Sequence, residues 1–154
     1  MPRVSYKTWS DRKDKGPAVG IYSFGANSSN SPAAQFEFDV TLFRDPTGQK
    51  QFNGLNGTDP TVRDWVSSDR RIPAVLDHCT LLAKDLLTPR IKNGHGDGEP
   101  ISKWISFSFK DYHGKWIAPA VAEKVAERLT GLGFTVLVVH HTLKNDQCHI
   151  YPAE

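Results

Sequence analysis

One stretch of the chain, residues 102–141 (SKWISFSFKDYHGKWIAPAVAEKVAERLTGLGFTVLVVHH), limits the fold more than any other. Apolar and polar residues alternate over 105–110, which is the pattern of a half-buried strand. Beyond a polar turn, apolar residues recur at helical spacing, at Ile117, Val121, Val125, Leu129 and Leu132. Glycines then end the helix, and 134–139 is a short apolar run typical of a buried parallel strand. We therefore expect a strand–helix–strand (βαβ) unit here.

The rest of the chain adds elements in an order typical of an α/β protein. We predict strands at 18–25 and 35–43, helices from Asp59-Pro60 and over 72–87, and loops over 44–58 and 92–100. On the C-terminal helix, the polar surface is expected to carry Glu123, Lys124, Glu127 and Arg128. This order predicts a single α/β domain over 18–154, with a mixed or mostly parallel sheet, a C-terminal βαβ unit and helices packed on the sheet.

Composition narrows the class of protein. The 154 residues carry a net charge of +2, which argues against a chain that coats nucleic acid but leaves a local basic patch open. Residues 1–17 interleave basic residues with Tyr6 and Trp9, so this arm is either a nucleic-acid contact or a mobile, solvated terminus. The polar N-terminus and the lack of a long apolar run predict no signal peptide, no membrane segment and a cytoplasmic protein. Cys79 and Cys148 are expected to be free thiols.

A candidate binding site follows from the βαβ unit. In such sheets ligands bind beyond the carboxyl ends of the strands, and here that end is the run KDYHGKW, residues 110–116. The site is expected to place positive charge and a flexible backbone at a helix N-terminus, where an anion can bind, and to offer Trp116 for stacking on a base or a sugar. Its candidate residues are Lys110, Tyr112, His113, Gly114, Lys115, Trp116, His141 and Asp45. The competing interpretation is an ordinary surface turn, with Trp116 packed on the core.

Several histidines are candidate ligands for a metal ion. His95 and Asp97 lie in the glycine-rich loop, and two candidate ligands are weak evidence for a site. His140 and His141 end the last strand, where with His113 they would form an imidazole cluster. Strand alternation directs the two adjacent histidines to opposite faces, so only one is expected at the site. No metal or other cofactor is therefore assigned.

The order and spacing of several short segments resemble the C-terminal domain of the RNase adapter protein RapZ, from Ile21 to Leu143. The segments that carry the resemblance are Ser23-Phe24-Gly25, Phe38-Asp39-Val40, Asp45-Pro46, Gly57, Asp59-Pro60, Val62-Arg63-Asp64, Val66, Val121-Ala122-Glu123, Ala126-Glu127-Arg128-Leu129 and His141-Thr142-Leu143. The resemblance implies a domain that binds a phosphorylated amino sugar, within a full-length protein that binds small RNAs. The family uses backbone N–H groups, a helix dipole and an arginine to hold the phosphate.

This chain departs from the family where that chemistry lies. The family turn has the pattern Gly-Cys-Thr-Gly-Gly-x-His-Arg-Ser, of which only Gly114 remains. Trp116 replaces the histidine, Ile117 the arginine, Ala118 the serine and, in an earlier loop, Thr47 a second histidine. An isoleucine cannot make the bidentate phosphate contact of an arginine, so the family's mode of sugar-phosphate binding is in doubt.

The sequence supports three hypotheses of different class. The first is a non-enzymatic module that recognises a phosphorylated small molecule or RNA at residues 110–118. The second is a regulatory, protein-interaction role on a scaffold whose ligand pocket is dead. The third is hydrolysis of a phosphate ester by His113, His141 and Asp111, although no motif with recognised catalytic spacing is present. The identity of the ligand, a protein partner and self-association stay open.

Overall fold

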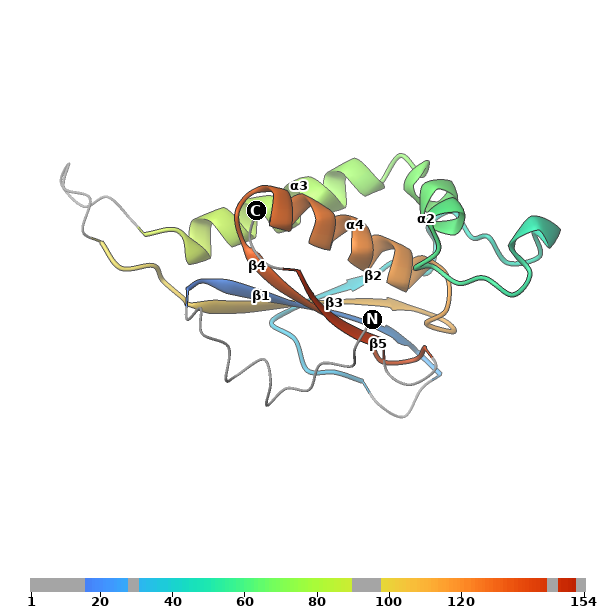
Figure 1. Ribbon diagram of the computed structural model, residues 1–154, viewed down its shortest axis with the longest axis horizontal. Coiled ribbons are helices and arrows are strands. Elements are labelled where there is room, and N and C mark those ends of the chain that lie inside the picture. Colours follow the sequence, from blue (N-terminus) through green and yellow to red (C-terminus); the bar gives the residue numbers. More distant parts are fainter. Residues whose placement is uncertain (1–15, 28–30, 90–97, 144–146, 152–154) are drawn as a thin grey trace.

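The computed structural model describes residues 16–27, 31–89, 98–143 and 147–151. Over these residues one sheet carries three α-helices on the same face (Figure 1). In chain order the elements are β1 (Ala18–Gly25), β2 (Phe36–Asp39), the 3₁₀ turn η1 (Lys50–Phe52), α2 (Pro60–Ser67), α3 (Ile72–Leu87), β3 (Trp104–Asp111), α4 (Ile117–Gly131), β4 (Thr135–His140) and β5 (Gln147–Tyr151). The basic arm and the loop with His95 and Asp97 fall largely outside the described residues.

The sheet has the strand order β2-β3-β1-β4-β5. β1 lies in the middle and pairs in parallel with β3 and β4, β2 pairs in parallel with β3, and only β5 runs antiparallel to its neighbour. The prediction of an α/β fold with a mostly parallel sheet is therefore confirmed. Helix α4 joins β3 to β4 across β1, so the carboxyl ends of β1, β2, β3 and β4 share one rim of the sheet.

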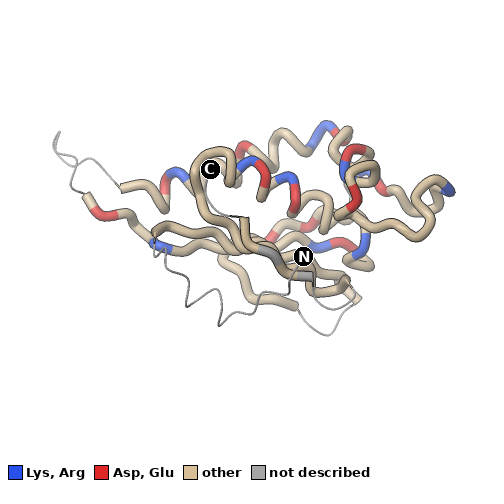
Figure 2. The backbone as a smooth tube through the Cα atoms, in the orientation of Figure 1, with Lys and Arg blue, Asp and Glu red and all other residues tan. Residues whose placement is uncertain are grey.

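The core lies between the sheet and its helices. Alternate strand residues such as Ile21, Phe107 and Val136 are completely buried there against the apolar face of α4, which includes Val121 and Val125. Burying a side chain of this size stabilises a fold by about 1.5–3 kcal/mol. A smaller apolar cluster occupies the other sheet face and contains Ala18, Tyr22, Leu137 and Val139. Basic and acidic residues are interspersed along the helices (Figure 2), and no helix of the described part is long and apolar enough to cross a membrane.

Three local predictions need correction. The sequence pattern predicts only a short polar tail after Leu143, but residues 147–151 form β5, whose Cys148 and Ile150 pack against the smaller cluster. The strand predicted over 35–43 is only four residues long, and a 3₁₀ turn lies within the expected loop. Both cysteines are thiols, as expected, and burial raises the pKa of the Cys79 thiol to about 12.

Candidate functional site

The turn between β3 and α4 lies at the rim where the parallel strands end. Gly25, the last residue of β1, pairs with Asp111, the last residue of β3. Asp39 at the end of β2 pairs with Lys110, and helix α4 begins six residues after Asp111, at Ile117. The predicted location of this turn is therefore correct.

The carboxylate of Asp111 occupies the start of α4. Its Oδ2 accepts hydrogen bonds from the backbone N–H groups of Ile117 and Ala118, both at 2.9 Å, and its Oδ1 accepts one from Gly114 N–H. Asp111 is 4% exposed. The expectation that these N–H groups face an external anion is therefore wrong, because the chain supplies its own anion at the positive end of the helix dipole.

The position of Asp111 has an energetic cost. Burial raises the pKa of this carboxyl group, the three N–H donors lower it, and the nearby carboxylate of Asp45 raises it again; the net direction is upward. Keeping the buried group ionised therefore costs free energy that the hydrogen bonds offset only in part.

Other segments hold the turn from its remaining sides. Gly57 N–H donates to the carbonyl of Lys115 at 2.8 Å, and Gly25 N–H donates to Thr142 Oγ1 at 2.8 Å. Gly114 has φ +70° and lies against Gly25 and Thr142, where a Cβ would come within 2.6 Å of Thr142 Oγ1. These glycine and threonine positions leave no room for a larger residue at the back of the turn.

We expect Gly114→Ala to lower the free energy of unfolding by about 2 kcal/mol or more, since it adds a clash to the cost of a positive φ. Gly54→Ala is the matched control, because Gly54 has φ +80° and open space around it. The free energy of unfolding of the control should fall by only about 1 kcal/mol. Urea unfolding of the two variants measures the difference, and equal losses would show that the turn tolerates a Cβ.

A small polar hollow lies in front of the turn. It is lined by Thr41, Asp45, Thr47, Asp111, Tyr112, His113, Trp116 and Ile117, and its volume is about 40 Å³. Small-molecule sites typically measure about 300–1,000 Å³, so this hollow takes only a few waters. Asp45 Oδ1 accepts hydrogen bonds from the backbone N–H and the hydroxyl of Thr47. Two carboxylates at the hollow disfavour a phosphate inside it.

The structure brings together four of the predicted site residues, Asp45, Tyr112, His113 and Trp116, around this hollow. The rings of Tyr112 and His113 are both exposed and meet edge to face, with their centroids 4.7 Å apart. The ammonium group of Lys115 lies 4.6 Å from the centroid of the Trp116 ring. Tyr112, His113 and Lys115 thus form an exposed rim that combines aromatic surface with positive charge, whereas Trp116 is half-buried and packs against the core, as the competing interpretation expects.

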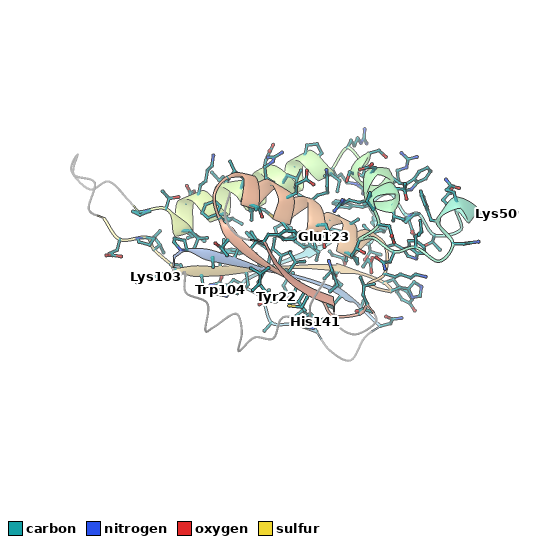
Figure 3. The ribbon with its side chains drawn as sticks, in the orientation of Figure 1. Tyr22, Lys50, Lys103, Trp104, Glu123 and His141 are labelled. Atoms are coloured by element: carbon teal, nitrogen blue, oxygen red, sulfur yellow. The ribbon has the colours of Figure 1, made fainter. Side chains whose placement is uncertain are left out.

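Lys110 and His141, which were also predicted for the site, do not line this hollow. The ammonium of Lys110 is 3.9 Å from the Asp39 carboxylate. His141 is half-buried beside Tyr22, with ring centroids 5.7 Å apart (Figure 3). His140 is completely buried and contacts Glu123 of α4, whereas His141 lies beside Tyr22 of the cluster on the other face, so the two adjacent histidines face opposite sides of the sheet. Within the described part of the chain, no three metal-binding side chains come together.

A buried polar network under α4 was missed by the sequence reasoning. His140 Nδ1 is 2.6 Å from Ser23 Oγ, and His140 Nε2 is 2.7 Å from Glu123 Oε1. The hydroxyl of Tyr151 donates to Glu123 Oε2 at 2.8 Å, and burial beside this carboxylate raises the pKa of Tyr151. Glu123 was expected on the polar surface but is 4% exposed. The run of alanines and valines on both sides of it was the available signal.

Comparison with known proteins places the chain among RapZ relatives. A family model described as the RapZ C-terminal domain matches residues 17–144. A nucleotide-binding protein of Dinoroseobacter shibae is 27% identical over 135 residues, which cover 87% of this chain and 43% of that protein. A nucleotide-binding protein of Zymomonas mobilis is 28% identical over 128 residues, which cover 83% and 38%. The chain thus spans about two-fifths of the length of these relatives.

Proposed function

The chain belongs to the RapZ C-terminal domain family, and on this premise we propose that it is a non-enzymatic module that binds a nucleotide or a similar phosphorylated small molecule. The ligand binds across the exposed rim formed by Tyr112, His113 and Lys115, beside the half-buried Trp116. The observation that carries the proposal is this rim, which places aromatic rings beside cationic groups at the carboxyl ends of parallel strands. The names of the relatives support a nucleotide-like ligand.

The Asp111 carboxylate at the start of α4 determines which groups are left to bind the ligand's phosphate. Asp111 already saturates the N–H groups that the family uses, so the ligand's phosphate contacts side chains such as Lys115 and His113 instead. The ring of the ligand stacks on Tyr112, which is 60% exposed. Binding that relies on exposed charges weakens as salt rises, because counterions screen them. Affinity is therefore expected to be modest and dependent on ionic strength.

The test is a fluorescence or calorimetric titration with AMP, glucosamine 6-phosphate and a short single-stranded RNA, each at low and high salt. Lys115→Ala is expected to weaken AMP binding about tenfold at low salt, and Tyr112→Ala by a similar factor. Lys84→Ala, an exposed lysine on α3, should leave binding unchanged. The absence of saturable binding to every probe at low salt would contradict the proposal.

A second function, protein interaction on a scaffold with a closed pocket, is favoured by one observation. The hollow holds only about 40 Å³, and the carboxylate of Asp111 fills the anion site behind it. A partner recovered in stoichiometric amount, together with no response to the small-molecule probes, would select this function. Hydrolysis of a phosphate ester is not proposed, since the three N–H donors engage both oxygens of Asp111 and leave it poorly placed as a base.

A further inference from the structure

A basic surface lies where the loop after β2 meets the turn between α2 and α3. We call it the arginine face and define it by Leu42, Arg44, Arg70 and Arg71. All four residues are exposed, and Leu42 has 82% of its surface in solvent. Two adjoining hollows share Arg71: one is lined by Arg44, Asp69, Arg70 and Arg71, and the other by Asp39, Thr41, Leu42, Phe43 and Arg71.

Internal contacts hold two of these arginines in place. The guanidinium carbon of Arg44 lies 3.7 Å from the centroid of the Trp65 ring, and that of Arg71 lies 4.7 Å from the centroid of the Phe43 ring. Arg71 also donates to the carbonyl of Leu42, which ties the loop to the start of α3. Guanidinium groups that are already ordered lose less entropy when a partner binds.

The arginine face has an excess of positive charge. Asp69 is the neighbouring carboxylate, and Arg71 engages it through Nε at 2.9 Å and Nη2 at 2.6 Å. Arg70 makes no ion pair or side-chain hydrogen bond within the described part of the chain. At the far edge, the carboxylate of Asp39 accepts hydrogen bonds from Thr41 and lies near Lys110. The charges of Arg44 and Arg70 are therefore left for a negatively charged partner.

We infer that the arginine face docks an acidic segment of a partner protein. In this complex, carboxylates of the partner meet Arg44 and Arg70, while an apolar side chain covers Leu42. Arginine is enriched at protein interfaces, where ordered guanidinium groups bind carboxylates in pairs of hydrogen bonds. RNA is the weaker match, because sequence-tolerant RNA binding needs open aromatic faces for base stacking. Here guanidinium groups cover faces of Trp65 and Phe43.

The experiment uses the whole chain and a capped synthetic peptide with one leucine flanked by two glutamates on each side. A second peptide carries alanine in place of the leucine. At low salt, Arg70→Ala is expected to weaken binding of both peptides about five- to tenfold. Leu42→Ser should weaken the leucine peptide about fivefold and leave the alanine peptide unchanged. Lys84→Ala should alter neither, and Arg70→Lys should recover only part of the affinity.

Three results would overturn the inference. The first is no binding of the leucine peptide at millimolar concentration and low salt. The second is equal affinity of both peptides with no effect of Leu42→Ser, which would show only nonspecific attraction between charges. The third is that the chain does not bind the peptide but binds a ten-nucleotide oligouridine, and that Arg70→Ala abolishes this RNA binding. Such a result would assign the surface to nucleic acid. Arg70 has no side-chain partner among the described residues, so its replacement should not unfold the chain.

Discussion

Glu123→Ala is expected to lower the free energy of unfolding by about 3–5 kcal/mol, because it leaves two largely buried polar groups without their partner, at about 1–3 kcal/mol each, and removes buried side-chain volume. The substitution takes the acceptor from His140 Nε2 and from the Tyr151 hydroxyl, both of which remain in a mostly buried site. It also leaves a cavity between α4 and the sheet. The network joins α4 to β1, β4 and β5, so several elements lose a shared contact at once.

Urea unfolding with matched controls measures the effect. Glu127→Ala changes the same residue type on the same helix, but the Glu127 side chain is 66% exposed and forms a surface ion pair with Lys124. The free energy of unfolding of Glu127→Ala should fall by no more than about 0.5 kcal/mol. Glu123→Gln keeps the shape and one acceptor oxygen, so it should lie between the two. A loss below about 1 kcal/mol for Glu123→Ala would show that water or other groups replace the carboxylate at little cost.

The helices and strands with a clear hydrophobic pattern were predicted well. The bounds of α3 agree with the prediction, and β1 and β4 lie where their apolar runs placed them. These elements satisfy their hydrogen bonds locally or bury long apolar stretches, so the local pattern is strong. β5 was missed because its five residues mix polar and apolar types, and its pairing with β4 is what makes it a strand.

The polar contacts were harder to predict, because hydrophobic periodicity does not indicate which partner a polar side chain takes. Asp59 is the N-cap residue of α2, yet its carboxylate makes no capping hydrogen bond and accepts from Asn56 N–H at 2.7 Å instead. Glu123 was assigned to the surface because one helical stripe was considered, whereas α4 is buried on most of its circumference. Asp111 contacts amides six and seven residues ahead, beyond the spacing of a local helix cap.

Removal of the internal anion at the start of α4 has the second large expected effect. Asp111→Ala leaves the N–H groups of Gly114, Ile117 and Ala118 without their acceptor. Unsatisfied buried donors cost about 1–3 kcal/mol each, although water entering the space recovers part of this. The variant also avoids the cost of burying an ionised carboxylate. We therefore expect the free energy of unfolding, measured in urea, to fall by a net of about 3 kcal/mol. Asp45→Ala, at the same hollow, should lose less than about 1 kcal/mol because Asp45 is exposed.

The same variant tests whether Asp111 takes the place of a ligand's phosphate. With the carboxylate gone, the three N–H groups and the helix dipole form a vacant anion site. Inorganic phosphate at about 50 mM should then stabilise Asp111→Ala by about 1 kcal/mol, as expected for a dissociation constant near 10 mM. The unmodified chain and Asp45→Ala should gain much less at matched ionic strength with chloride. Equal gains in all three proteins would mean that phosphate acts elsewhere, and that Asp111 stabilises the turn without competing for an anion.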